Sequence, residues 1–210
     1  MITAAARENM VDSQVRTSDV TDAALQAAMR RIPRERFCAA GSAELAYAET
    51  PVEIAPGRQL LEPRELAKLL QALAPRAGER ALVICEPYAA AVLADAGLEV
   101  TAVDTPEVVA RVRDALHDEG VETVVASQPA TPDVESEFDL ILGGGAVADV
   151  PASWVDRLAE GGRLGVVVRT GVLGRATLFV RGGGATTGRA VFEAAPPYLP
   201  GLEPKPAFAF

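Results

Sequence analysis

Histidine and cysteine are almost absent from this chain of 210 residues, which has one histidine and two cysteines. Zinc sites are built from several such side chains, and two cysteines cannot form a disulfide framework. The composition therefore predicts neither a metal site nor a disulfide-stapled fold. His117 lies among acidic residues and is expected on the surface, whereas Cys38 and Cys85 are expected to be small buried side chains without a catalytic role.

Long apolar runs are also missing. No uncharged apolar stretch is long enough to span a membrane, and the N-terminal segment lacks the apolar core of a signal peptide, so we expect a cytoplasmic protein that does not bind membranes. Aromatic residues make up only 5%, while hydrophobic residues, with alanine and valine prominent, make up 49%. At a length that one hydrophobic core can support, this mixture favours a single α/β domain over an aromatic-rich β-sandwich.

Basic charge is scarce, since the formal net charge is -9 and the isoelectric point is near 4.7. Binding a phosphate backbone requires Lys and Arg, so nucleic acid is excluded as an expected partner and a protein partner stays open. One basic cluster, interrupted by Glu35, consists of Arg30, Arg31, Arg34 and Arg36. We interpret these arginines as cations that complement the dipole at a helix end.

Short β-branched runs alternate with helical segments after residue 80, and this pattern predicts a parallel, doubly wound sheet. The expected strands are 81–85, 99–103, 121–126, 138–142 and 163–168, and the expected helices are 88–95, 106–119 and 151–160. Two later strands, 176–181 and 189–194, are separated by a glycine-rich turn that is too short for a crossover helix. They are predicted to form a C-terminal antiparallel hairpin.

The segments on either side of this sheet are assigned to the same domain. Residues 1–78 are predicted to form a helical arm and loop, with helices at 4–16, 22–31 and 64–73, and residues 79–194 form the sheet core. The tail, 195–210, is rich in proline and is expected to be extended. Its composition favours disorder, and the alternative is docking through Phe208 and Phe210.

Several segments, in their order along the chain, resemble the protein-L-isoaspartate O-methyltransferases. The most specific are IPRERF (32–37), AYAETPVEI (46–54), PGRQLLEP (56–63), FDLIL (138–142) and LAEGGRL (158–164), and the likeness spans residues 10 to 180. The resemblance implies a Rossmann-like methyltransferase fold. It also implies transfer of a methyl group from S-adenosylmethionine to the side-chain carboxylate of an isoaspartyl residue in a damaged protein.

The turn after the first sheet strand departs from the family's pattern. Family members carry a glycine-rich turn there, where backbone N–H groups and a helix N-terminus receive the cofactor's carboxylate. Here the turn reads Cys85-Glu86-Pro87-Tyr88, which has no glycine and is about two residues shorter. Pro87 lacks an N–H, and Glu86 places a negative charge where the cofactor would place its own. Two like charges ~4 Å apart repel by about 4 kcal/mol at an effective dielectric near 20, so cofactor binding is predicted to be impaired.

Three further positions belong to the candidate cofactor site, which comprises Cys85, Glu86, Tyr88, Asp104, Gly143 and Gly144 as remnants of the family's site. Asp104 ends the second sheet strand, where an acidic residue commonly accepts hydrogen bonds from ribose hydroxyls, and the alternative is a cap for the helix beginning near Pro106. Gly143 and Gly144 follow the fourth strand at the edge where ligands bind in such folds. The favoured alternative for them is a flexible turn before the next helix.

The loop that carries the substrate-binding serine in the family is altered as well. The family's Gly-Gln-Thr-Ile-Ser-x-Pro pattern reads Gly-Arg-Gln-Leu-Leu-Glu-Pro at residues 57–63. Leu61 replaces the serine, and Glu62 adds an anion near the place where an anionic substrate would bind. We therefore regard Gln59, Leu61 and Glu62 as degenerate substrate-groove residues and assign no catalytic residue.

Two functions stay open from the sequence. The favoured one is a non-catalytic, binding or regulatory family member, a pseudoenzyme with an impaired S-adenosylmethionine site. The alternative is an active S-adenosylmethionine-dependent protein-L-isoaspartate carboxyl methyltransferase that repairs proteins. A dinucleotide oxidoreductase is disfavoured because no G-x-G-x-x-G pattern follows the first sheet strand.

Overall fold

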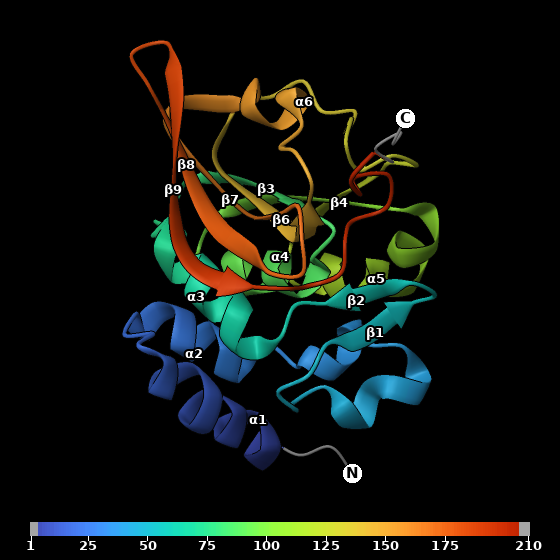
Figure 1. Cartoon of the computed structure of the whole chain (residues 1–210). Helices are drawn as coiled ribbons and strands as arrows, with labels where there is room; N and C mark the ends of the chain where they lie inside the picture. The colour runs from blue at the N-terminus through green and yellow to red at the C-terminus, as the bar shows by residue number, and fades with distance from the viewer. Residues whose placement is uncertain (1–3, 206–210) are drawn as a thin grey trace.

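The computed structural model describes residues 4–205, which form one main sheet covered by helices on both faces (Figure 1). The strands of this seven-stranded sheet lie in the order β5-β4-β3-β6-β7-β8-β9. Their bounds are β3 Arg80–Ile84, β4 Glu99–Asp104, β5 Glu122–Val125, β6 Phe138–Val147, β7 Leu158–Arg169, β8 Gly174–Gly182 and β9 Ala185–Ala194. Strands β3 to β7 are parallel, and β8 and β9 are antiparallel, so the predicted doubly wound sheet with a C-terminal hairpin is confirmed.

Alternate residues of the central strands supply two buried clusters on opposite faces of the sheet. Ala81 and Val83 of β3 belong to the cluster that packs against α3 (Pro63–Leu73), α4 (Pro87–Asp95) and α5 (Pro106–Asp118). Leu82 and Ile84 belong to the other cluster, which includes Trp154 of the short helix α6 (Ala152–Val155). The chain thus buries both faces of its parallel strands, as such sheets require.

The N-terminal arm packs against α3 and α4, below the sheet in the view of Figure 1. Its elements are α1 (Ala4–Met10), a π-helical turn η1 (Val11–Val15), the 3-10 turns η2 (Arg16–Ser18), η3 (Arg34–Phe37) and η4 (Ala40–Leu45), and α2 (Ala23–Arg31). Asp22 caps α2 by accepting hydrogen bonds from the N–H groups of Ala24 and Leu25, so the helix expected at 22–31 is confirmed. A separate hairpin, β1 (Val52–Ala55) with β2 (Arg58–Leu60), leads into α3.

Three sequence predictions about these elements are wrong. The helix expected at 151–160 is only the four residues of α6, because β7 already begins at Leu158. The flexible turn favoured for the glycines after the fourth strand does not exist, since β6 continues through Gly143 and Gly144 to Val147. Composition favoured disorder for the tail, but residues 195–205 are ordered against the domain, with Pro196 and Leu199 buried. The alternative of docking through Phe208 and Phe210 concerns residues outside the described range.

The predictions for the two cysteines and the histidine are confirmed. Cys38 and Cys85 are free and buried, and His117 is exposed. None of the helices in residues 4–205 combines the length and the apolar character that crossing a membrane requires.

Candidate functional site

The candidate site lies at the carboxyl ends of the parallel strands, between β3 and β6. Strand order reverses there, because the chain continues from β3 to β4 and β5 on one side and from β6 to β7 on the other. In sheets of this kind, ligands bind in the crevice at such a switch point. The turn Cys85–Pro87, the end of β6 and the β1–β2 hairpin all meet at this crevice.

The turn after β3 keeps a glycine-like backbone without a glycine. Cys85 has a φ of 63°, in the left-handed region that favours glycine, and it is fully buried. Glu86 then takes the N-cap position of α4 without a side-chain capping bond, and Pro87 begins the helix. The helix start predicted from the sequence is confirmed, and Pro87 offers no N–H to a ligand.

Glu86 points into the protein instead of toward solvent. Only 1% of the residue is exposed, and its Oε2 atom accepts a hydrogen bond of 2.9 Å from the backbone N–H of Leu61. Burial raises the pKa of the Glu86 carboxyl to about 7, although the nearby positive charges of Arg34 and Arg58 oppose the shift. Glu86 therefore joins the loop at residues 57–63 to the first turn of α4.

Arg58 reaches across the crevice from β2 and forms an ion pair with Asp104, the acidic residue at the end of β4. Its Nη2 atom donates to both carboxylate oxygens of Asp104, at 3.1 and 2.9 Å, and to the carbonyl oxygen of Cys85 at 2.9 Å. The side chains of Arg58 and Asp104 are only 7% and 5% exposed. Burial raises the pKa of the Asp104 carboxyl even though Arg58 opposes the shift. The carboxylate that a ribose would require is thus held by the chain's own guanidinium.

Asp104 is also not the cap of the following helix. The N-cap of α5 is Thr105, and Asp104 accepts a 2.8 Å hydrogen bond from the Thr105 N–H. The capping alternative from the sequence is therefore wrong. Asp104 sits where the resemblance placed the ribose partner, but its bonding capacity is used within the chain.

Arg34 forms the floor of the same region, and its predicted role at the helix end is wrong. It is fully buried, its Nε donates to the carbonyl of Ala46, and its Nη2 donates to the carbonyl of Leu61. The guanidinium carbon lies 5.0 Å from the ring centre of Tyr88, which is itself fully buried on α4. Tyr88 therefore packs beneath the loop as a structural side chain.

Gly144 and Gly145 allow the chain's own atoms to fill the crevice. A Cβ on Gly144 would lie 2.3 Å from the Cβ of Glu86, and a Cβ on Gly145 would lie 2.7 Å from the side chain of Leu199. Gly143 is similarly crowded by Trp154. Their position at the ligand-binding edge of the sheet predicted ligand contacts at Gly143 and Gly144, but the close approaches at these glycines come from residues of the same chain.

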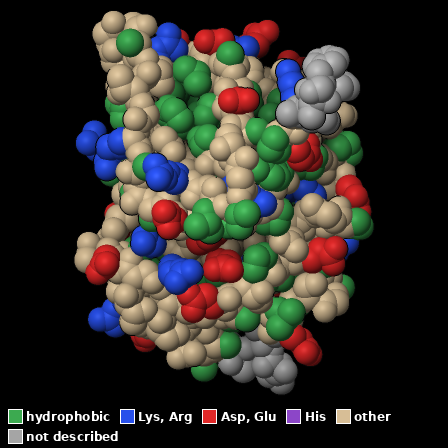
Figure 2. Space-filling model, viewed as in Figure 1, with side chains coloured by type: hydrophobic (Ala, Val, Ile, Leu, Met, Phe, Trp, Pro, Cys, Tyr) green, Lys and Arg blue, Asp and Glu red, His purple; other side chains and the backbone are tan. Residues whose placement is uncertain are grey.

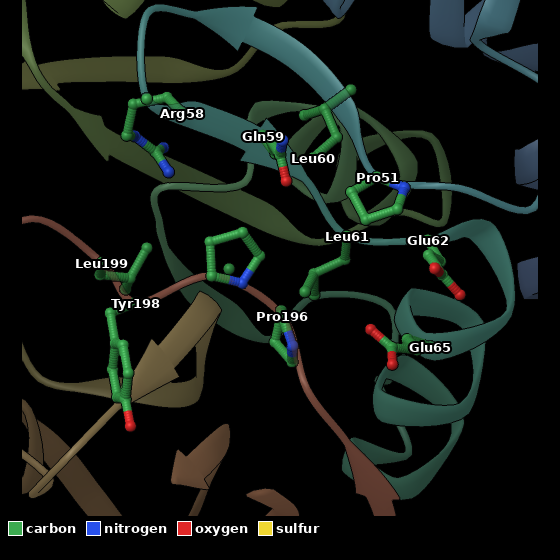
Figure 3. A pocket seen from close by; sticks show the side chains of 13 residues that line it. Pro51, Arg58, Gln59, Leu60, Leu61, Glu62, Glu65, Pro196, Tyr198 and Leu199 are labelled. Carbon is green, nitrogen blue, oxygen red and sulfur yellow. The ribbon is translucent and has the colours of Figure 1, made fainter. Parts of the chain in front are cut away.

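The cavities that remain beside these groups are small. One, of about 10 Å³, is lined by residues that include Gln59, Leu61, Pro196 and Leu199 (Figure 3). A second, also of about 10 Å³, lies between Glu86 and α5. Each holds roughly one water molecule, whereas sites for small organic ligands usually measure about 300–1,000 Å³. In this arrangement, the residues present do not fit S-adenosylmethionine.

Larger hollows lie elsewhere on the molecule. One, of about 390 Å³, is lined by Arg80, Glu99 and Glu122, which begin their strands and so mark the opposite edge of the sheet. That edge is not where ligands bind in doubly wound folds. Within residues 4–205, no group of three or more His, Cys, Asp or Glu side chains is placed to hold a metal ion.

The predicted substrate-groove residues lie side by side, but they lack the hydroxyl group that family members carry in this loop. Gln59 and Leu61 line the small cavity, and Leu61 is buried with both backbone groups bonded, its N–H to Glu86 and its carbonyl to Arg34. Glu62 is partly buried at the N-cap of α3, with Arg64 3.8 Å away. No hydroxyl is available at Leu61 to contact a substrate carboxylate.

Breaking the buried ion pair tests how tightly the site is closed. Asp104→Asn leaves Arg58 buried without an opposite charge, and we expect a loss of about 3–5 kcal/mol in the free energy of unfolding by urea. Asp118→Asn makes the same chemical change in the surface pair with Arg36, whose Asp118 side chain is 58% exposed, and is expected to cost less than about 1 kcal/mol. Equal losses would mean that the pair is solvated and the crevice open.

Comparison with known proteins places this geometry in a family. The family model for protein-L-isoaspartate(D-aspartate) O-methyltransferase matches residues 5–193. The protein-L-isoaspartate O-methyltransferase of Methylorubrum populi is 38% identical over 183 residues, which cover 84% of this chain and 85% of the relative. The enzyme of that name from Methanoculleus marisnigri is 33% identical over 164 residues, covering 75% and 74%.

Solved structures agree with this assignment at the level of the fold. A structure of a protein-L-isoaspartate O-methyltransferase has a TM-score of 0.79 and 21% identity, covering 94% of this chain and 67% of that one. A Plasmodium falciparum structure described as a beta-aspartate methyltransferase in complex with S-adenosyl-L-homocysteine has a TM-score of 0.78 and 17% identity, covering 90% and 96%. Together with the family match, these likenesses confirm the resemblance predicted from the sequence: the chain belongs to the protein-L-isoaspartate(D-aspartate) O-methyltransferase family.

Proposed function

We propose that this chain is a non-catalytic member of its family that acts by binding a protein and does not use S-adenosylmethionine. The observation that carries the proposal is the buried contact of Arg58 with Asp104 and Cys85, which fills the ribose position of the crevice. The Glu86 carboxylate adds a second obstacle at the turn, where the cofactor's carboxylate would need backbone N–H groups.

The substrate side supports the same proposal. Leu61 presents no hydroxyl, and Glu62 places a carboxylate beside the groove for an anionic substrate. The segment after β9 covers this groove, with Pro196 lying beside Leu61 in Figure 3. A methyl acceptor would therefore have to displace part of the chain before it could reach the crevice.

A protein fits the surface better than nucleic acid does as a partner. Acidic and basic side chains are interspersed on the face drawn in Figure 2, and the net charge of the chain is -9. The basic cluster of the arm is engaged internally, because Arg30 pairs with Asp12 and Arg31 with Asp95. These contacts leave little positive charge for a phosphate backbone.

The second candidate function is active protein-L-isoaspartate carboxyl methylation. The 38% identity to the Methylorubrum populi relative favours it, because that likeness covers most of both chains. For this function, the Arg58–Asp104 pair would have to open whenever the cofactor binds. The two candidates therefore differ in one measurable property, the affinity for the cofactor or its demethylated product.

Thermal unfolding distinguishes the two functions. We expect millimolar S-adenosylhomocysteine to leave the melting temperature of the full chain unchanged within about 1 °C. A ligand at free concentration L stabilises a protein by RT ln(1 + L/Kd), and a very large Kd makes this quantity negligible. An active enzyme at 100 times its dissociation constant would gain ~2.7 kcal/mol, or several degrees for a domain of this size. An increase of that magnitude in differential scanning calorimetry would contradict the proposed function.

A further inference from the structure

The segment that follows β9 crosses the crevice beside the end of β6, first extended and then turning at Pro200–Gly201, and we call residues 196–202 the strap. Its backbone is bonded to the end of β6: the Ala146 N–H donates to Pro197, the Leu199 N–H donates to Ala146, and the Ala148 N–H donates to Leu202. Ala146 and Tyr198 form a parallel bridge. The family match ends at residue 193, so the strap lies beyond it.

The strap occupies the space where the neighbouring strand of the sheet has ended. The last β3 residue paired to β6 is Ile84, opposite Gly143, and the chain then turns away at Cys85. The next positions of β6 are therefore free on that side, and the strap pairs with them. In Figure 1 the strap is the dark red trace that leaves β9 and runs past the ends of the strands toward the C-terminus.

Two side chains fix the strap in one register. Leu199 is 1% exposed and packs into the cluster around Trp154, and Gly145 provides the space for it. Tyr198 donates from its hydroxyl to the carbonyl of Arg169, whose guanidinium lies 4.6 Å from the tyrosine ring centre and donates to the carbonyl of Pro196 at 2.7 Å. One apolar anchor, one aromatic clamp and backbone bonds thus hold an extended segment.

This combination is how proteins bind extended peptides along a free strand edge. Main-chain hydrogen bonds supply affinity and side-chain pockets supply specificity in such complexes. Prolines at 196 and 197 pre-organise the extended part of the strap and Pro200 lies in its turn, so less entropy is lost on docking. Because the strap is a late segment of the chain, it can leave without breaking the strands of the main sheet.

We propose that the crevice beside Ala146–Ala148 is a docking site for an extended segment of a partner protein, with a leucine between prolines, and that the strap is its exchangeable resident. The inference rests on the proposed function and names the partner class of that site. Recognition is by backbone and by the Leu199 pocket, and it requires neither an isoaspartyl carboxylate nor a cofactor. The strap competes with any partner at an effective concentration on the order of millimolar.

The probe is a fluorescein-labelled synthetic peptide with the sequence of residues 195–205. We expect it to bind a chain truncated after Ala195, as measured by fluorescence anisotropy, and to bind the full chain at least tenfold more weakly because the strap occupies the site. The same peptide carrying Leu199→Asp is expected not to bind, since burying a carboxylate in the apolar cluster that holds Leu199 is unfavourable.

A second variant keeps the whole chain. Leu199→Asp in the full-length protein should release the strap, leave Gly145 and the pocket intact, and restore peptide binding to within about threefold of the truncated chain. Leu173→Asp is the matched control, because Leu173 is 64% exposed, and should bind the peptide as weakly as the unaltered chain.

Four results would overturn the proposal. The first is that neither variant binds the peptide although circular dichroism shows both folded, and the second is that the full chain and the variants bind it equally. The third is that both variants unfold, and the fourth is that the full chain is a dimer that Leu199→Asp converts to a monomer. The third would make the strap an integral part of the core, and the fourth would make a second copy the occupant. Calorimetric binding of S-adenosylhomocysteine to the full chain would contradict the proposed function separately, whatever the peptide does.

Discussion

A repaired chain, in which Glu86-Pro87 is replaced by a four-residue glycine-containing turn together with Cys85→Gly and Arg58→Gln, is expected to bind S-adenosylhomocysteine measurably. The turn restores backbone N–H donors, and Cys85→Gly removes a side chain from a backbone with a φ of 63°. Arg58→Gln places the family's residue at this position and frees Asp104 for ribose hydroxyls. We expect the dissociation constant, measured by calorimetry, to fall by at least tenfold.

The control for this repair keeps Arg58. A chain with the new turn but an unaltered Arg58–Asp104 pair is expected to bind at least tenfold more weakly than the fully repaired chain. Equal affinity of the two would show that Arg58 does not block the site. A fully repaired chain that is folded by circular dichroism and still binds nothing would place the defect outside Arg58 and the turn.

Methyl transfer should need a further change even after the cofactor site is repaired. Leu61→Ser supplies a hydroxyl and Glu62→Gln removes the negative charge near the substrate carboxylate, so the pair should raise methylation of an isoaspartyl peptide above that of the repaired chain alone. The strap also lies against this loop. Transfer that is efficient without either substitution would contradict the role assigned to these positions.

Glu86→Gln is expected to make the protein more stable above neutral pH. The Glu86 pKa is about 7 in the folded chain, against an ordinary value of 4.5, so the folded state takes up a proton that the unfolded state does not hold between these values. The stabilisation is complete below about pH 4.5 and is lost as the pH rises through about 7. Above it, charged Glu86 costs about 3 kcal/mol, which glutamine avoids while still accepting the Leu61 N–H.

Urea unfolding at pH 5.0 and pH 8.0 measures this effect. Relative to the unaltered chain, Glu86→Gln should gain up to about 3 kcal/mol at the higher pH and much less at the lower pH. Glu135→Gln on the exposed surface is the matched control and should change stability by less than about 0.5 kcal/mol at either pH. A stability difference for Glu86→Gln that does not vary with pH would mean that Glu86 does not titrate in this range.

Local patterns predicted most of the fold, because the sheet strands carry β-branched runs and the longer helices are continuous segments between them. The helices expected at 22–31, 88–95 and 106–119 correspond to α2, α4 and α5. The helix expected at 151–160 was wrong because its second half is captured by pairing of β7 with β6. Tertiary pairing of this kind is not visible in local periodicity.

The site was only partly predictable for the same reason. The resemblance pointed to the turn at Cys85–Tyr88 and to Asp104, and these residues do meet at the crevice. The residues that fill it were missed: Arg58 lay within the quoted loop pattern without being singled out, and Arg34 was interpreted as a cation that complements the dipole at a helix end. One signal could have identified Arg58. It is an arginine where the family pattern has glutamine, and Asp104 at the end of a strand offers it a carboxylate partner.

The strap was not predicted, because the proline-rich composition of residues 195–210 indicates an extended or disordered segment and does not show where that segment docks. Leu199 is a single apolar residue among prolines, and the space that it fills is provided by Gly145 and an apolar cluster from segments distant in sequence. Only the three-dimensional arrangement brings them together.

Isothermal titration of the full chain with S-adenosylhomocysteine decides whether the crevice is closed to the cofactor. With Arg58 bonded to Asp104 and Glu86 bonded to Leu61, we expect no heat of binding up to millimolar ligand at pH 7 to 8. The same experiment on the repaired chain serves as the positive control. Saturable one-to-one binding to the unaltered chain with a micromolar dissociation constant would show instead that the crevice opens for the cofactor, and the chain would not be a non-catalytic family member of the kind proposed.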